Sequence, residues 1–110
     1  MKEPTRPSEK RRSPRIEVDL PVTLNWGKKQ YRWRARQFSE FGILLATSQK
    51  ELVGQDVELS LDLDSFDSDV ALSGIVAYAT DGGIAVRFKN LTADQRATLR
   101  AFINIHHKAN

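Results

Sequence analysis

Two short segments of the sequence combine residue types that can bind a nucleotide. The first is Arg11-Arg12-Ser13-Pro14-Arg15, in which Pro14 favours an extended backbone and two arginines lie four positions apart. The planar guanidinium group of arginine forms paired hydrogen bonds with guanine O6 and N7 or with phosphate, and it also stacks on bases. This segment suits an anionic ligand that contains bases, although paired arginines are common and do not identify one.

The second segment, Gln37-Phe38-Ser39-Glu40-Phe41-Gly42, lies between two apolar stretches. The side chains of Gln37 and Ser39 can hydrogen-bond to a base edge or a phosphate, and Gly42 allows a ligand to approach the backbone closely. The alternative is an ordinary turn, in which the serine closes the loop and the glycine supplies a positive φ. Taken alone, the segment favours the ordinary turn.

Other kinds of site find little support in the sequence. The 110-residue chain has no cysteine, which excludes disulfides and thiolate metal sites. Its two histidines, His106 and His107, are adjacent, and neighbouring helical residues point about 100° apart, so they do not converge on one metal ion. Most acidic residues are spaced two apart, as on the solvated face of a strand. We therefore expect no metal site, no cofactor and no enzymatic activity.

Charge is distributed unevenly along the chain. Residues 1–15 carry six lysines and arginines and two glutamates, whereas residues 51–86 carry eight acidic residues and no lysine or arginine. A basic end separated from an acidic flank can attract an anion, and a solubilising tail is an equally favoured explanation. No apolar run approaches the roughly 18 residues of a membrane span, and no secretory signal is recognised, so we expect a cytoplasmic protein without membrane insertion.

Hydrophobic periodicity predicts the elements that must position these segments. Residues 1–15 are polar, contain three prolines and are expected to form a flexible arm. Pro21 favours an edge position or a bulge. Apolar patterning predicts strands at residues 16–26, 31–36, 43–46, 57–63, 70–78 and 84–88.

The chain after the last strand has the pattern of one amphipathic helix, at residues 92–106. Thr92 and Gln95 have the spacing of a capping box, and apolar residues then recur at helical intervals. The residues Asp81-Gly82-Gly83 are typical of a tight hairpin. Six short strands with hairpin-length links suggest a closed antiparallel barrel, which leaves no exposed edge, with the helix packed on it.

Together, the two polar segments resemble the signature of the PilZ domain family, an RxxxR motif before the first strand followed by a [D/N]xSxxG motif. The resemblance extends through RRSPRIEVDLPVTL, FSEFGILL, LVGQDVELSLDL and GGIAVRFKNL. It implies a mainly β fold: a six-stranded antiparallel PilZ-type β-barrel with a C-terminal α-helix and a flexible basic N-terminal arm. The domain would span residues 10–106, after a flexible tail of residues 1–9.

The resemblance also implies the ligand, the second messenger cyclic di-GMP (c-di-GMP), and the residues that bind it. Arg11 and Arg15 match the RxxxR positions and would grip guanine and phosphate. Ser39 and Gly42 match the second motif and would line the barrel side of the pocket.

Three further positions belong to this expected site. Lys10 occupies the place that in this family influences whether one ligand or an intercalated pair is bound, and Arg12 lies within the first motif. Gln37 stands where the family pattern has Asp or Asn. Its extra methylene moves the amide by about 1.5 Å, and a carboxylate would favour the guanine N1 and N2 donors more strongly. We expect weakened binding, which Asp or Asn at position 37 would tighten.

Three functional hypotheses follow. The first is a receptor or adaptor that passes the c-di-GMP signal to a partner protein as the ligand orders the arginine arm. The second is a PilZ-fold adaptor that binds protein partners without ligand. The third is a small nucleic-acid-binding barrel, suggested by the arginines at 32, 34 and 36 beside Tyr31 and Trp33. Alternation instead favours an arrangement in which these aromatic side chains belong to the core. The arginines then form a solvated face that pairs with the acidic strand at 56–62.

Overall fold

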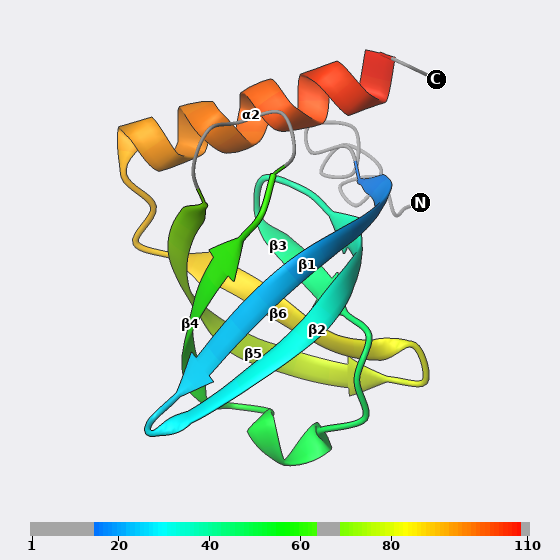
Figure 1. Ribbon diagram of the computed structural model, residues 1–110, viewed down its shortest axis with the longest axis vertical. Coiled ribbons are helices and arrows are strands. Elements are labelled where there is room, and N and C mark those ends of the chain that lie inside the picture. Colours follow the sequence, from blue (N-terminus) through cyan, green and yellow to red (C-terminus); the bar gives the residue numbers. More distant parts are fainter. Residues whose placement is uncertain (1–14, 64–68, 109–110) are drawn as a thin grey trace, which may run out of the picture.

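The computed structural model describes residues 15–63 and 69–108, with side chains among them as far as Ile105. Six strands form a closed antiparallel barrel in the order β1-β2-β3-β6-β5-β4 (Figure 1). The predicted barrel and C-terminal helix are therefore confirmed. The strands are β1 (Ile16–Trp26), β2 (Lys29–Phe38), β3 (Gly42–Leu45), β4 (Asp56–Leu61), β5 (Val70–Thr80) and β6 (Gly83–Lys89). A short 3₁₀ helix, η1 (Lys50–Leu52), joins β3 to β4, and α2 (Ala93–Lys108) follows β6.

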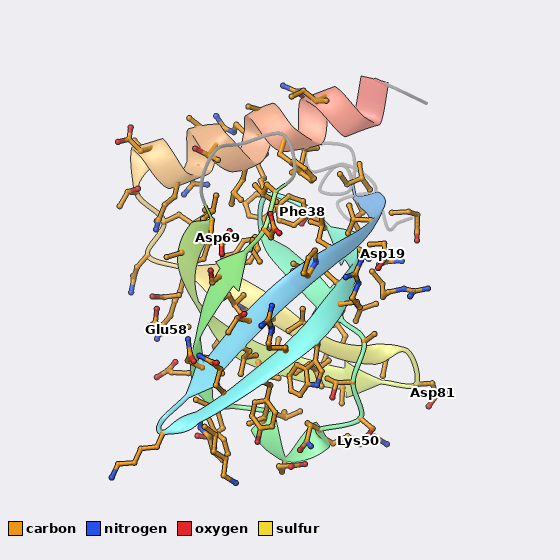
Figure 2. All side chains as sticks on the ribbon, viewed as in Figure 1. Asp19, Phe38, Lys50, Glu58, Asp69 and Asp81 are labelled. Carbon is orange, nitrogen blue, oxygen red and sulfur yellow. The ribbon has the colours of Figure 1, made fainter. Side chains whose placement is uncertain are left out.

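Apolar side chains fill the barrel, and α2 lies across one of its ends (Figure 1). Phe102 of α2 is fully buried and meets Phe38 of β2 edge to face, with ring centroids 5.4 Å apart. Phe38 also contacts Phe88 of β6 at 6.2 Å, so three aromatic rings join the helix to the barrel (Figure 2 labels Phe38 beneath α2). Neither helix in the described ranges is long and apolar enough to cross a membrane.

The start of α2 has the predicted capping box. The Thr92 backbone N–H donates to Gln95 Oε1 at 2.8 Å, and the Gln95 N–H donates to Thr92 Oγ1 at 3.0 Å. These bonds satisfy two of the backbone donors that a helix N-terminus leaves open. Gln95 Nε2 also donates to the Ala71 carbonyl of β5 at 2.8 Å, which ties the helix start to the sheet.

The links between strands differ in one respect from the prediction of hairpin-length connections. The β1–β2, β2–β3 and β5–β6 links are short, but β3 and β4 are not neighbours, and the chain between them crosses the barrel through η1. Two backbone bonds hold this crossing on β5, from the Gly54 N–H to the Val76 carbonyl at 2.7 Å and from the Val76 N–H to the Gln55 carbonyl at 3.0 Å.

The strand order argues against the expected pairing of the arginine stripe with the acidic strand, because β2 and β4 are not neighbours in the described barrel. In the barrel, β1 separates β2 from β4. Arg34 Nε instead forms an ion pair with Asp19 Oδ1 of β1 at 2.8 Å, while Asp56 of β4 pairs with Lys89 of β6 at 2.7 Å. Figure 2 shows Asp19 on the outside of the barrel.

The aromatic residues of β2 also differ from expectation, because they are half-buried against the core and not enclosed in it. The rings of Tyr31 and Trp33 stack on each other with centroids 4.7 Å apart. A ring that is covered on one face by another ring has less surface to offer a nucleic-acid base, which argues against the nucleic-acid hypothesis.

The Arg34 guanidinium, through its hydrogen bond and its charge, holds the pKa of Asp19 below its ordinary value of 3.8. A depressed folded-state pKa means that the pair contributes stability above pH 3.8 and loses it as the pH falls through the folded-state pKa. Both side chains are more than half exposed, so the contribution is small.

We expect Arg34→Gln to raise the pKa of Asp19 toward 3.8, as measured by NMR titration of the side-chain carboxyl. Arg32→Gln removes a cation from the same exposed stripe and should leave that pKa unchanged. An Asp19 pKa that responds equally to both substitutions would contradict the specific pair.

Candidate functional site

Two bulges turn polar side chains onto the outer face of the barrel. In β2 the register with β3 shifts between Ala35 and Gln37, and Ala35 and Phe38 are both buried, so Gln37 faces outward beside its partner Leu44. In β5 the register with β6 shifts between Val76 and Tyr78, which pairs Tyr78 with Ala85. A bulge inserts one residue, and a one-residue shift sends the following side chains to the opposite face.

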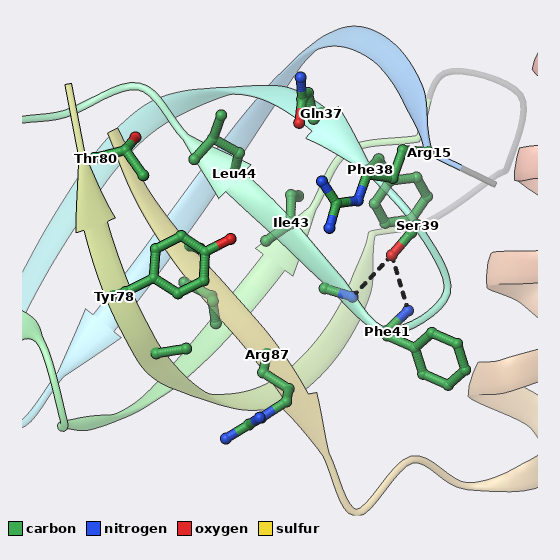
Figure 3. A pocket seen from close by; sticks show the side chains of 14 residues that line it. Arg15, Gln37, Phe38, Ser39, Phe41, Ile43, Leu44, Tyr78, Thr80 and Arg87 are labelled. Carbon is green, nitrogen blue, oxygen red and sulfur yellow. Dashed lines mark hydrogen bonds between the residues drawn. The ribbon is translucent and has the colours of Figure 1, made fainter. Parts of the chain in front are cut away.

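A hollow of about 400 Å³ lies on this outer face, over β2, β3, β6 and β5 (Figure 3). Its floor includes the outward-facing apolar side chains of Leu44, Ala77 and Ala85. Polar groups and aromatic rings surround the floor, contributed by Arg15, Gln37, Ser39, Phe41, Tyr78, Thr80 and Arg87. An apolar floor with a few polar groups around it is typical of sites for small organic ligands.

The loop between β2 and β3 is closed by Ser39. Its Oγ accepts the backbone N–H groups of Phe41 at 3.1 Å and Gly42 at 3.3 Å, drawn as dashed lines in Figure 3. The Ser39 N–H also donates to the Gly42 carbonyl at 3.0 Å. The hydroxyl therefore closes the loop, as the ordinary-turn explanation predicts. Because a hydroxyl has one hydrogen and two lone pairs, Ser39 still has a proton to donate to a ligand.

Contacts outside the loop fix its position. The side chain of Glu40 is only 13% exposed. Its Oε1 accepts a hydrogen bond from Arg100 Nε of α2 at 3.0 Å, and the two side chains form an ion pair. The Phe88 N–H of β6 donates to the Phe41 carbonyl at 2.9 Å. Phe41 itself is 51% exposed, so its ring is available at the rim of the hollow.

Gly42 is required for a reason other than the positive φ of an ordinary turn. The described glycines with positive φ are Gly27, Gly54 and Gly83, so that expectation for Gly42 is wrong. A Cβ atom at Gly42 would instead lie 2.5 Å from the Val86 carbonyl oxygen of β6, a distance that real Cβ atoms do not adopt. Glycine therefore allows β3 to pair closely with β6 beneath the hollow.

We expect Gly42→Ala to lower the free energy of unfolding by about 1–3 kcal/mol, in the range for overpacking, because the backbone of β6 must move. Gly82→Ala is the matched control, since its Cβ would meet only Thr80 Oγ1 at 3.8 Å. Urea unfolding of both variants measures the difference. Equal stability of the two variants would contradict the close pairing.

Cationic groups dominate the electrostatics of the hollow. Arg15, directly before β1, and Arg87, on β6, both line it, and no carboxylate does so among the described residues. Arg87 is the register partner of Gly42, so its backbone lies beside the closed loop, and Figure 3 shows its guanidinium directed away from Ser39. Two arginines beside an apolar floor provide hydrogen-bond donors and positive charge for a phosphate-containing ligand.

The structure brings four of the predicted site residues together at this hollow: Arg15, Gln37, Ser39 and Gly42. Lys10, Arg11 and Arg12 lie outside the described residues, and the binding role of all seven stays a prediction. Sequence reasoning missed Tyr78 and Arg87 as lining residues. One signal of an outer hollow was present in the sequence: outward positions such as Leu44 are apolar, although alternation predicts polar residues there.

Comparison with known proteins identifies the family. The model of the PilZ domain matches residues 9–104, so the chain belongs to the PilZ domain family. PilZ domains are ligand-binding receptor domains. Comparison with curated protein sequences gives no match.

Solved structures share the fold at low sequence identity. The PilZ domain of YcgR from Escherichia coli, with c-di-GMP, has a TM-score of 0.72 at 12% identity over 89% of this chain and 92% of that one. The MrkH–c-di-GMP complex of K. pneumonia has a TM-score of 0.69 at 18% identity over 89% of this chain. The inhibitor of motility MotI/DgrA of Bacillus subtilis has a TM-score of 0.70 at 13% identity over 87% of this chain. This chain spans about half the length of the latter two, 52% and 50%.

Proposed function

We propose that this protein is a non-enzymatic receptor that binds c-di-GMP in the hollow beside the β2–β3 loop and passes the signal to a partner protein. The observation that carries the proposal is the convergence of Arg15, Gln37, Ser39 and Gly42, all taken from two separated motifs, on one hollow. The presence of c-di-GMP in the YcgR and MrkH structures supports the choice of ligand.

The chemistry of the hollow suits the two parts of this ligand. A cyclic dinucleotide carries two phosphates, for which Arg15 and Arg87 provide charge-assisted donors. It also carries two planar guanines, which can lie on the apolar floor or stack on an exposed ring such as that of Tyr78. No bond is made or broken, so the binding energy is available to order the protein around the ligand.

The arginine arm would cover the side of the ligand that the barrel leaves open. Arg15 lines the hollow, and Arg11 is four residues away, which is within about 14 Å for an extended chain. The arm can therefore close over a ligand held in the hollow, and ordering it creates a surface that the free protein does not present. This surface is where we place the partner protein, in the cytoplasm.

A PilZ-fold adaptor that binds no ligand is the second candidate. The observation that favours it is Gln37, which replaces the Asp or Asn of the family pattern. Calorimetric titration of the wild-type chain with c-di-GMP separates the two candidates, because the adaptor gives no heat of binding. Comparable binding of c-di-GMP and single-stranded RNA, weakening together with added salt, would support the nucleic-acid hypothesis instead.

We expect Arg15→Ala to weaken c-di-GMP binding by about 1.5–3 kcal/mol, the range for hydrogen bonds to charged groups, and Arg11→Ala to do the same. Isothermal titration calorimetry measures the loss, and unchanged thermal unfolding shows that the fold is intact. Arg32→Ala removes an exposed cation from the other part of β2 and is the control for net charge. If Arg15→Ala binds like the wild type, the ligand is held elsewhere.

Tyr78 lines the hollow but belongs to neither sequence motif, so its substitution tests a part of the site that the motifs do not predict. Its ring is 52% exposed at the hollow, and stacking of one base on an aromatic ring contributes about 1–3 kcal/mol. We expect Tyr78→Ala to lose this amount of binding energy and Tyr78→Phe to retain most of it. A loss in Tyr78→Phe as large as that in Tyr78→Ala would assign the contribution to the hydroxyl and not to the ring.

A further inference from the structure

Gln37, the residue that departs from the family pattern, has a charged partner outside the hollow. Its Nε2 donates to Glu17 Oε2 at 3.3 Å, and the two residues are register partners across β1 and β2. Register shifts lie next to this pair in both strands, between Glu17 and Leu20 in β1 and between Ala35 and Gln37 in β2. The pair therefore belongs to the irregular part of the barrel that forms the site.

The identity of the partner determines which way the Gln37 amide faces. An ionised carboxylate only accepts hydrogen bonds, so the –NH₂ group of Gln37 must face Glu17. The amide oxygen is then on the opposite side of the same planar group and is free to face the hollow that Gln37 lines. Figure 3 shows the oxygen of Gln37 on the side of the other lining residues and the nitrogen away from them.

We infer that Glu17 is a positioning residue that holds the Gln37 amide with its oxygen toward the hollow and so makes the site selective for guanine. This inference rests on the proposed c-di-GMP function. Guanine presents the N1–H and N2–H donors on one edge, which a fixed acceptor satisfies. Adenine presents an acceptor at N1 in the corresponding place, which would face the amide oxygen unpaired.

The same pair accounts for glutamine at position 37. An aspartate there would put a carboxylate directly opposite Glu17, and like charges at opposed strand positions are destabilising. With Glu17 present, a neutral amide can still present an acceptor to the ligand, and the charge behind it polarises that acceptor. With Glu17 in place we therefore expect Gln37→Asp to weaken c-di-GMP binding, whereas the family pattern alone predicts tighter binding.

Titration of the full chain with c-di-GMP and, separately, cyclic di-AMP tests this role. In Glu17→Ala we expect the affinity for c-di-GMP to fall about 3- to 10-fold, as for one neutral hydrogen bond, while that for cyclic di-AMP stays the same or rises. Loss of a carboxylate near an anion site would by charge alone strengthen both. Opposite responses of the two ligands therefore separate positioning from a general effect of charge.

Two further variants at the same position sharpen the test. Glu17→Gln keeps an acceptor for the Gln37 –NH₂ group and should restore most of the wild-type preference. Glu17→Lys supplies a donor, which turns the amide so that its –NH₂ group faces the hollow, and should reduce the preference further than Glu17→Ala. Asp62→Asn, which removes an exposed charge on the far side of β1, is the control and should change neither affinity.

The double substitution Glu17→Ala with Gln37→Asp completes the cycle. Removing the opposing carboxylate should let the Gln37→Asp chain bind c-di-GMP more tightly than it does with Glu17 in place. If the wild type binds c-di-GMP but every Glu17 variant keeps the same preference over cyclic di-AMP, the inference is wrong and the proposed function stands. A wild-type chain that binds no c-di-GMP overturns both.

Discussion

The alternation of side chains between the two faces of a strand constrains this whole barrel, because closure makes one face the core. An uninterrupted β2 or β5 would direct Gln37 and Tyr78 inward, where a polar group without a partner costs stability. The bulges after Ala35 and Val76 release that constraint at two places and move both side chains outside. The hollow therefore exists where the regular pattern of the sheet is interrupted, and the remaining strand positions keep the core closed beneath it.

The packing of the barrel end gives this site a rigid border. The β2–β3 loop is tied to itself through Ser39, to β6 through the Phe41 carbonyl and to α2 through the Glu40–Arg100 pair. A ligand that contacts this loop meets groups already held in place, so little ordering is required on the barrel side. The helix that covers the core is thus also one of the supports of the site.

Local patterns in the sequence were sufficient for most of the fold. Alternation located the six strands, and the Thr92–Gln95 capping box located the start of α2 to within a residue. The pairing of the arginine stripe was not predictable, because the strand order that places β1 between β2 and β4 depends on contacts remote in sequence. The η1 crossing was missed for the same reason.

The lining residues that belong to the two sequence motifs were predictable, whereas those that strand pairing brings to the hollow were not. Arg15, Gln37, Ser39 and Gly42 come from the two motifs of the family resemblance, and the structure brings them to one hollow. Tyr78 and Arg87 reach the hollow through a bulge and a cross-strand register, neither of which has a marker in the local sequence. The same holds for the contact between Glu17 and Gln37, which lie twenty positions apart.

The close approach of Gly42 to Val86 bears on how the signature of this family is interpreted. A position that excludes every side chain for the sake of the backbone must remain glycine whether or not a ligand is bound. The serine that closes the same loop is also needed by the fold. In this chain the serine and glycine of the second motif are therefore needed by the architecture with or without a ligand, so their presence alone does not distinguish a binding domain from a ligand-free one.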